Sequence, residues 1–380
     1  MQWNGLFSLL PIASAWEFTQ DLDLAATVFP LFVGHMQWWG CYLVRDSNGV
    51  WRDANLNLPD NEHEGQPAID PMIALALISR IAAVTVDLGN ALHESIPPST
   101  LDIYLHLSPF PTIISNLSNT TSLWVSYENA TVAQSDTFAL YPLYPAEALG
   151  GIQPLPPGLR TLAQQSVAAY TQGWSTTGRP LDVFVAAILA LGGKGAALAQ
   201  GARTPEDIVT GLKGWLKNSL GRNQLGYAPG GGVENIGVSR AVTELLLGNG
   251  VLVPAIDVDR EAPSEGGARW FTKLFPAFNA SSMGPAAFTG LLAKGGCIYS
   301  AALQSGGVVS PVRISSTSSA SRTGGTNCTL LDPWAGQGCT VSVACSGTPV
   351  SAAWLNTTEG QAVSFLVPPA VGSSCTVTCA

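Results

Sequence analysis

Apolar residues recur at helical spacing in the first two thirds of the chain. The clearest run has an apolar side chain every three or four residues, at Ile73, Leu77, Ile81, Val84 and Leu88. Asp70-Pro71 precedes this run, and Asp is a good N-cap residue while Pro fits the first helical turn. The pattern therefore predicts a helix that begins at Asp70-Pro71 and stops at Gly89.

Further helices follow from the same spacing, with loop-rich polar stretches between them. The predicted ranges are 28–44, 159–170, 180–191 and 240–247. Thr204-Pro205-Glu206-Asp207 marks one more helix start, because it combines an N-cap, a Pro at the first position and an acidic residue in the first turn.

After Gly250 the pattern changes to short stretches that alternate between apolar and polar residues. Three such stretches are 339–343, 362–366 and 375–379, and alternation with period two predicts strands. We therefore expect a helical domain over 1–250, a linker over 251–284 and a C-terminal β-sandwich module over 285–380, with 315–326 as a Ser/Thr/Gly-rich connection.

Composition and charge exclude several classes of protein. The 17 basic and 26 acidic residues give a net charge of −9, which argues against a nucleic-acid partner. The 11 Trp, 8 Tyr and 12 Phe are too many core-forming residues for a disordered chain. The most apolar segment, from Pro71 to Gly89, contains Arg80 and Asp87, so we expect no membrane span.

The cysteines and glycosylation motifs indicate the secretory pathway of a eukaryote. Five of the seven cysteines crowd the last part of the chain, without the spacing or histidines of a zinc site, at Cys328, Cys339, Cys345, Cys375 and Cys379. We expect at least one disulfide among them and at least one free thiol in the whole chain. Asn-X-Ser/Thr motifs occur at Asn116, Asn119, Asn129, Asn279, Asn327 and Asn356.

The N-terminal segment has two interpretations. Residues 6–15 are apolar and end in Ala13-Ser14-Ala15, as in a secretory signal with its cleavage site. No Lys or Arg precedes them, and the segment runs directly into Trp16-Glu17-Phe18. The alternative is therefore an amphipathic helix followed by a turn and another helix.

Two loops concentrate polar residues. The first, 53–66, holds four carboxylates, three Asn, one Gln and one histidine in a chain with few charges, including Asp60, Asn61, Glu62 and His63. It is either a solvated acidic loop or a site for acid–base chemistry on a polar substrate; a metal site would need a second histidine.

The second loop is glycine-rich, from Gly230 to Gly237, and holds Glu234 and Asn235 before a helix. It lacks the Gly-Lys-Ser/Thr ending of a phosphate-binding loop. A carboxylate and an amide at a helix entrance suit hydrogen bonds to sugar hydroxyls, and an N-capping turn is the alternative. No Gly-X-Ser-X-Gly motif is present, and we expect neither metal nor cofactor.

Five segments, in order, resemble glycoside hydrolase family 95, the inverting α-L-fucosidases and galactosidases. Residues 16–31 are similar to its Trp-Glu…Pro-Leu segment, and Leu58–Glu62 falls where the family carries its general acid. The other three matches are 140–145, Gly173-Trp174-Ser175 with the following helix pair through Ala196, and 232–237. The resemblance implies a mainly α fold, an (α/α) toroid of helix hairpins, with only the C-terminal half of the six-hairpin barrel present.

The resemblance also implies a mechanism. Asp60 would protonate the leaving oxygen, and Glu234 would polarise water directly or through Asn235, with the two carboxyl groups about 6.5–9.5 Å apart in one cavity. Asn61, Glu62 and His63 would bind substrate, and the pocket would be lined by Trp51, Trp174 and Tyr227.

The chain also departs from the family pattern. Asp60 is one methylene shorter than the family's Glu, and Val233 stands where the family has an Asp. The family's N-terminal β-domain and first helices, which supply the Asn pair that activates water, have no counterpart. We therefore expect self-association or a requirement for further N-terminal sequence. The rival prediction is a non-catalytic carbohydrate-binding or structural remnant of such an enzyme.

Overall fold

The structure is a computed structural model of the 380-residue chain. It describes residues 3–54, 56–57, 67–114, 122–128, 130, 138–149, 157–170, 180–191, 198–219, 236–251, 270–317, 325–335, 337–357, 360–368 and 373–379.

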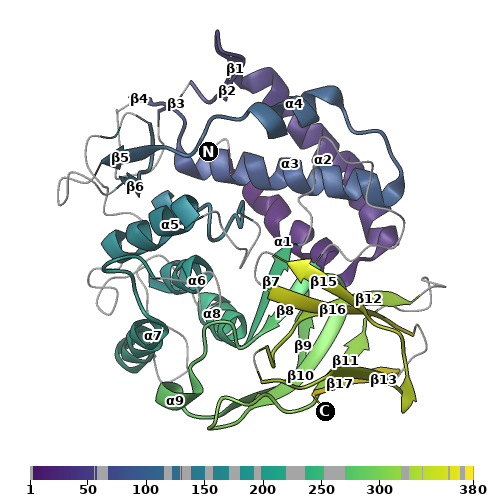
Figure 1. The fold of residues 1–380 in the computed structure, drawn as a ribbon. Coiled ribbons are helices and arrows are strands. Elements are labelled where there is room, and N and C mark those ends of the chain that lie inside the picture. The colour runs from purple at the N-terminus through teal and green to yellow at the C-terminus, as the bar shows by residue number, and fades with distance from the viewer. Residues whose placement is uncertain are drawn as a thin grey trace.

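Four helices form the first part of the molecule, and they pack on one another around one apolar core (Figure 1). They are α1 (Asn4–Thr19), α2 (Leu22–Tyr42), α3 (Met72–Leu92) and α4 (Pro98–His106). α3 lies at the centre, with 16 of its 21 residues buried. It is also the one helix in the described part of the chain that is long and apolar enough to span a membrane, but 83% of its most apolar window is buried inside the protein.

The start of α3 differs from the prediction. Pro71 is the N-cap and Asp70 has a left-handed backbone, so Asp70 does not cap the helix. Its carboxylate instead accepts hydrogen bonds from the Asp53 backbone N–H and the Ser108 hydroxyl. A carboxylate can accept hydrogen bonds from several donors, and the left-handed backbone at Asp70 turns its side chain away from the start of α3.

The N-terminal segment is a helix, as in the second interpretation of residues 6–15. Leu6, Leu9 and Ala13 of α1 are buried in the first core, and Trp16 donates its indole N–H to Asp87 of α3 at 2.8 Å. A turn at Gln20 separates α1 from α2, whose first turn is capped by the Asp21 side chain. Burial on one helix face explains why the segment is so apolar.

Four further helices surround a second core, together with the short 3-10 helix Phe138–Leu140. They are α5 (Pro157–Tyr170), α6 (Pro180–Ala190), α7 (Pro205–Ser219) and α8 (Ile236–Leu246). The predicted start of α7 is confirmed: Asp207 N–H donates to the Thr204 hydroxyl, and Thr204 N–H donates to the Asp207 carboxylate. This reciprocal pair satisfies two backbone donors at the helix start.

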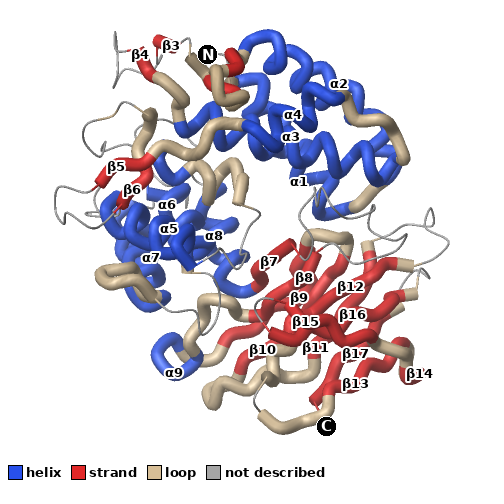
Figure 2. Tube along the Cα trace, turned by 45° about the horizontal axis from the view of Figure 1, so that its top comes forward, coloured by secondary structure: helices blue, strands red, loops and turns tan. Residues whose placement is uncertain are grey.

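The prediction of a mainly α toroid is wrong. The described helices form two groups with separate cores rather than a ring of hairpins, and two large sheets make the fold mixed α and β (Figure 2). Helical periodicity shows which residues face a core but not which helices share it, so the sequence does not distinguish a ring from two groups. The expected self-association was based on an open half-barrel, a premise that does not hold.

Two sheets form a sandwich with a third core between them (Figure 2). The five-stranded sheet has the order β15-β16-β12-β8-β7, with strands Ala353–Thr357, Gly360–Val367, Thr326–Leu331, Trp270–Leu274 and Leu247–Val251. The six-stranded sheet has the order β14-β13-β17-β11-β10-β9, with strands Thr348–Pro349, Val341–Cys345, Ser374–Cys379, Val312–Ser316, Cys297–Leu303 and Ala286–Ala293.

Alternation along the strands explains why the two sheets pack face to face. In β10, Cys297, Tyr299, Ala301 and Leu303 are buried while the residues between them are half-exposed. The stretches 362–366 and 375–379 fall in β16 and β17, which confirms them, and 339–343 overlaps β13, which begins two residues later, at Val341. β7 and β8, which lie before residue 285, complete the five-stranded sheet, and the proposed domain boundaries stay a prediction.

Short elements complete the description. Three small hairpins pair β1 with β2, β3 with β4 and β5 with β6, and one short helix, α9, precedes β9. Their bounds are Val44–Arg45, Trp51–Arg52, Leu56–Asn57, Pro67–Ala68, Thr112–Ile114, Ser122–Trp124 and Ala280–Met283.

Three disulfides hold the sandwich, which confirms the disulfide prediction. Two of them connect neighbouring parts of β13 and β17, as Cys339–Cys379 and Cys345–Cys375. The third, Cys297–Cys328, joins β10 of one sheet to β12 of the other. Cys41 on α2 is a free, exposed thiol. Three disulfides fit a protein that folds in an oxidising compartment.

Removing the inter-sheet disulfide is expected to destabilise the protein by about 2–4 kcal/mol, because the bond restricts the unfolded chain. The measurement is the free energy of unfolding of the double variant Cys297→Ala/Cys328→Ala in denaturant. Cys41→Ser serves as the control and should stay within about 0.5 kcal/mol of the wild type. Equal stabilities of the double variant and the wild type would contradict this expectation.

Candidate functional site

Most of the predicted site residues lie outside the described residues. These are Asp60, Asn61, Glu62, His63, Trp174, Tyr227, Glu234 and Asn235. The structure describes the elements that flank them. Residues 58–66 join β3 to β4, which pair antiparallel with Asn57 opposite Pro67, and residue 235 immediately precedes α8. The roles predicted for these residues stay predictions.

Trp51 is the predicted site residue that the structure describes, and its ring is half-buried. Its indole N–H donates to the Asp102 carboxylate at 3.0 Å, and the Arg45 guanidinium lies 5.7 Å from the ring centroid. The hydrogen bond to Asp102 and the contact with the Arg45 guanidinium therefore hold the Trp51 side chain in place on β2.

A cluster of charged groups anchors the segment next to the β3–β4 hairpin. The Arg52 guanidinium contacts three carboxylates, those of Asp46 at 3.0 Å, Asp70 at 2.9 Å and Glu128 at 2.6 Å. Asp70 is buried, and burial raises its pKa against the opposing hydrogen bonds from Ser108 and Asp53. The cluster joins β2, the start of α3 and the turn after β6, so it fixes both ends of the acidic loop.

A second group of charges lies where the helices meet the sandwich. Its six side chains alternate in sign and form one continuous chain of ion pairs, in the order Arg80, Glu17, Lys294, Glu147, Arg240 and Glu244. We call this group the ion-pair chain. Three positive and three negative side chains make it neutral, and this balance offsets part of the cost of burying them.

Lys294 is the central member of the ion-pair chain. It lies in the turn between β9 and β10, and its ammonium contacts Glu17 at 3.0 Å and Glu147 at 2.6 Å. The Lys294 backbone N–H donates to the Asn249 side chain, and the next residue, Gly295, donates its N–H to the Glu17 carbonyl. The turn between β9 and β10 is therefore joined to the end of α1 by a backbone hydrogen bond as well as by the Lys294–Glu17 ion pair.

Burial and neighbouring charges shift the pKa values within the ion-pair chain. Burial alone would raise the pKa of Glu17, but the charges of Arg80 and Lys294 outweigh it and hold the pKa below its usual range. Lys294 and Arg240 lower the pKa of Glu147 in the same way, against burial. Burial raises the pKa of Glu244, and the nearby Glu147 adds to this while Arg240 opposes it.

The ion-pair chain connects the helices that follow the two predicted loops. α3 follows the acidic loop and carries Arg80, while α8 follows the glycine-rich loop and carries Arg240. At 1.5 Å per residue, Arg80 lies about 12 Å from the start of α3, and Arg240 about 6 Å from the start of α8. Sequence reasoning did not find this group, since its members are far apart in the sequence and carry no motif.

Acid is expected to destabilise the protein through the ion-pair chain. Glu17 and Glu147 have lowered pKa values in the folded state, whereas unfolded Glu takes up a proton near pH 4.3. The unfolded state therefore binds more protons just below that pH, and stability is lost as the pH falls through this window. Glu244 has a raised pKa in the folded state, so above pH 4.3 it makes the stability fall as the pH rises. The stabilities are therefore compared below pH 4.3.

The measurement is the free energy of unfolding in urea at several pH values below 4.3. Glu147→Gln should lower the dependence on pH, because the neutral amide does not titrate. Glu94→Gln, at an exposed position after α3, is the matched control and should keep the wild-type dependence. An unchanged dependence in Glu147→Gln would refute the assignment.

Within the described residues, no group of three or more His, Cys, Asp or Glu side chains could hold a metal ion.

Comparison with known proteins leaves the family open. No family model matches the chain. No curated protein matches its sequence either. Among solved structures, an α-L-rhamnosidase from Streptomyces avermitilis, complexed with L-rhamnose, is similar at 14% identity and a TM-score of 0.38. The match covers 96% of this chain and 32% of the rhamnosidase, so this chain spans about a third of that enzyme. A match at this level assigns neither fold nor activity.

Proposed function

We propose that this protein acts on carbohydrate, as a glycoside hydrolase that removes α-linked fucosyl or galactosyl residues by an inverting mechanism. The chemistry needs one carboxylic acid to protonate the leaving oxygen and a second carboxylate to activate water. Asp60 takes the first role, and Glu234 takes the second directly or through Asn235. The proposal requires no cofactor.

The observation that carries the proposal is the support given to the two loops. Each loop precedes a helix, the acidic loop through the short strand β4 and the glycine-rich loop immediately, and the ion-pair chain joins those two helices through buried and half-buried side chains. The Arg52 cluster fixes the base of the acidic loop in addition. Catalytic groups need such rigid support, since a displacement of about 1 Å can cost about 10²-fold in rate.

Substrate contacts follow from the residues near the two acids. Asn61, Glu62 and His63 would hydrogen-bond sugar hydroxyls, and the aromatic rings of Trp51, Trp174 and Tyr227 would pack on sugar faces. Trp51 alone of these is described, and its contacts with Asp102 and Arg45 would hold its ring in one orientation.

The alternative is a carbohydrate-binding protein without turnover. It is favoured by one observation: the helices form two groups with separate cores, so the barrel that normally encloses such an active site is not built by the described residues.

The experiment offers the purified full chain the p-nitrophenyl α-glycosides of fucose, galactose and rhamnose, with release of nitrophenol and binding measured in parallel. Turnover supports the hydrolase. Binding without turnover supports the alternative, and the absence of both rejects a carbohydrate function at these loops. Proton NMR of the released sugar tests inversion, because the first anomer formed must be opposite to that of the substrate.

We also propose that the protein is secreted and glycosylated. The three disulfides support an oxidising compartment. Of the motifs within the described residues, Asn279 and Asn356 are exposed, whereas Asn327 is half-buried and accepts a hydrogen bond from Ser364. Glycans are therefore expected on Asn279 and Asn356 before Asn327, which mass spectrometry of the secreted protein tests.

A further inference from the structure

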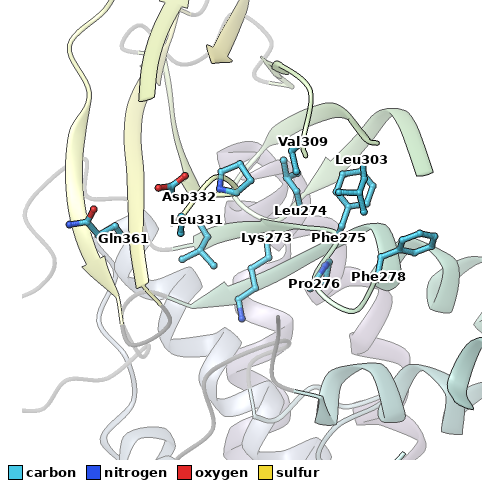
Figure 3. A pocket seen from close by; sticks show the side chains of 12 residues that line it. Lys273, Leu274, Phe275, Pro276, Phe278, Leu303, Val309, Leu331, Asp332 and Gln361 are labelled. Carbon is cyan, nitrogen blue, oxygen red and sulfur yellow. The ribbon is translucent and has the colours of Figure 1, made fainter. Parts of the chain in front are cut away.

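The sandwich contains a cavity of about 250 Å³ at one end, with a mainly apolar wall that includes Phe275, Phe278 and Leu303 (Figure 3). Polar side chains border it, but the Asp332 carboxylate and the Lys273 amine point apart, so they do not converge on one ligand (Figure 3). A set of apolar side chains that faces outward lies on α2 of the first helix group.

α2 has a buried apolar face and an exposed face. The buried side chains lie toward α1, α3 and α4 and are Ala25, Val28, Phe32, Met36 and Trp39. Between residues 27 and 41 the exposed residues are Thr27, Pro30, Leu31, Gly34, Gln37, Trp38 and Cys41. We call these seven residues the outer face of α2. Leu31 is 46% exposed and Trp38 is 47% exposed, so two large apolar side chains of this face are in contact with water.

The outer face of α2 carries no charge, which is unusual for a helix in contact with water. No Asp, Glu, Lys or Arg occurs from Leu24 to Val44. The solvent side of a helix normally carries charged residues, as α7 does with its exposed Asp207, Lys213 and Lys217. An uncharged helix face with an exposed Trp and an exposed Leu is typical of a contact surface.

The outer face is arranged in the same way on both sides of Gly34. Its members lie three, four and seven residues before Gly34 and three, four and seven residues after it. A helix turns by about 100° per residue, so these positions form one stripe with Gly34 at its centre. A two-fold axis through this centre turns the stripe onto itself and reverses the helix direction. Two copies of the stripe can therefore face each other as an antiparallel pair.

Gly34 allows the two helices to approach closely. A Cβ atom at Gly34 would meet nothing within 4 Å, so the space outside this residue is open. With no side chain at the centre, the two helix axes can come within about 8 Å, the lower end of the usual range. Trp38 of each copy then lies beside Leu31 of the other, because both positions are on the same side of the stripe, four residues after its centre and three before it.

The charges beyond the ends of the outer face are complementary in this pair. Asp23 lies eleven residues before Gly34 and Arg45 lies eleven residues after it, and both are exposed. Antiparallel pairing brings Asp23 of each copy to the end that carries Arg45 of the other. Arg45 contacts Asp102 of its own chain at 3.2 Å, and its five N–H donors leave capacity for a second carboxylate. A parallel pair would place like charges together, so charge favours the antiparallel pair.

We propose that the outer face of α2 binds the same face of a second copy of this chain, as an antiparallel, two-fold symmetric pair centred on Gly34. A lipid surface also covers apolar helix faces, but helices that lie on membranes carry Lys and Arg beside the apolar face, and α2 has neither. The contact depends neither on the proposed function nor on a half-barrel. One helix from each copy makes a small interface, so we expect a dissociation constant on the order of 10–100 µM.

The first test is sedimentation velocity of the full chain from about 1 to about 200 µM, where the wild type should show a monomer–dimer equilibrium. Gly34→Glu should weaken the dimer at least about tenfold, because two carboxylates meet at the point of closest approach. Its monomer should fold, since the space at Gly34 is open and Glu favours a helix more than Gly does. Gly214→Glu, at a helical glycine of α7 with equally open space, is the matched control and should dimerise as the wild type does.

The second test determines the register with a cysteine pair. Cys41 is a free, exposed thiol, and the proposed pair places it opposite Thr27 of the other copy. Thr27→Cys should therefore form a disulfide with the native Cys41 of the other copy. Oxidised glutathione takes up the two electrons and two protons, so each bond formed releases two molecules of glutathione. The linked dimer is detected on a non-reducing gel.

Two controls accompany this test. Gln37→Cys puts a thiol on the same face but out of register with Cys41, and it should stay unlinked. Thr27→Cys/Cys41→Ser lacks the second thiol and should also stay unlinked.

The proposal is overturned if the wild type is a monomer at about 200 µM, or if Gly34→Glu dimerises as strongly as Gly214→Glu. Linkage of Gln37→Cys or of the wild type as readily as Thr27→Cys shows a different register or a parallel pair, and overturns it too. A monomer that binds vesicles of phosphatidylcholine and phosphatidylserine assigns the outer face to a lipid surface instead. None of these results bears on glycoside hydrolysis, so failure here and failure of the proposed function can be told apart.

Discussion

Replacing Asp60 by Asn is expected to lower turnover of the α-glycoside substrate about 10²–10⁴-fold. The amide keeps the size of the side chain but cannot donate a proton to the leaving oxygen, which is the role proposed for Asp60. Because the contacts to the sugar remain, substrate binding should change little, and the loss should appear in kcat rather than in KM. The measurement is steady-state hydrolysis of the glycoside that the wild type cleaves fastest.

The control for this experiment is Asp23→Asn, at an exposed position in the first turn of α2. It removes one carboxylate without touching either loop and should leave kcat unchanged. A substrate with a better leaving group should recover part of the activity of Asp60→Asn, since its departure needs less protonation. Loss of less than about threefold in Asp60→Asn, or no recovery with the better leaving group, would remove Asp60 from the role of general acid.

Replacing Lys294 by Met is expected to destabilise the fold by about 3–5 kcal/mol. The change leaves the buried carboxylates of Glu17 and Glu147 without the ammonium that lies between them, and breaking a buried ion pair on one side typically costs this much. The measurement is the free energy of unfolding in denaturant near pH 7. Lys213→Met, at an exposed position of α7, is the matched control, because it removes an exposed lysine and should change the stability by less than about 0.5 kcal/mol.

A second variant separates charge from packing. In Lys294→Met/Glu147→Gln, one of the two buried carboxylate charges that lie beside the ammonium is removed together with it, so part of the lost stability should return. If the loss of stability in the double variant equals the sum of the losses in the two single variants, Lys294 acts through packing rather than through charge. A stability of Lys294→Met equal to that of the wild type would show that the ion-pair chain does not hold the sandwich to the helices.

Local patterns predicted individual elements well. Thr204 and Asp207 form the expected reciprocal cap because the interaction spans three residues and depends on little else. The alternating stretches of the C-terminal part became β13, β16 and β17 for the same reason. Asp70 was misjudged because its carboxylate has stronger partners in Ser108 and the Asp53 backbone, which are distant in the sequence.

Arrangement in space was not predictable from these patterns. Leu77 shows which face of α3 is buried, but nothing in its spacing indicates that α1, α2 and α4 cover that face. Likewise, Cys297 stands alone in the sequence, and only the packing of β10 against β12 brings it to Cys328. The ion-pair chain has the same origin: Glu17 and Lys294 meet through tertiary structure alone.

The position of β17 has a consequence for the order of events during synthesis. β17 lies in the middle of the six-stranded sheet, between β13 and β11, yet it is made after every other strand of that sheet. Until it arrives, the edges of β11 and β13 have no partner, and Cys339 and Cys345 cannot form their bonds with Cys379 and Cys375. Unpaired edges of this kind invite wrong pairing between chains. A nascent chain therefore depends on β17, and a nonsense mutation shortly before residue 374 would leave the six-stranded sheet as two separate parts, β13 with β14 and β9 with β10 and β11.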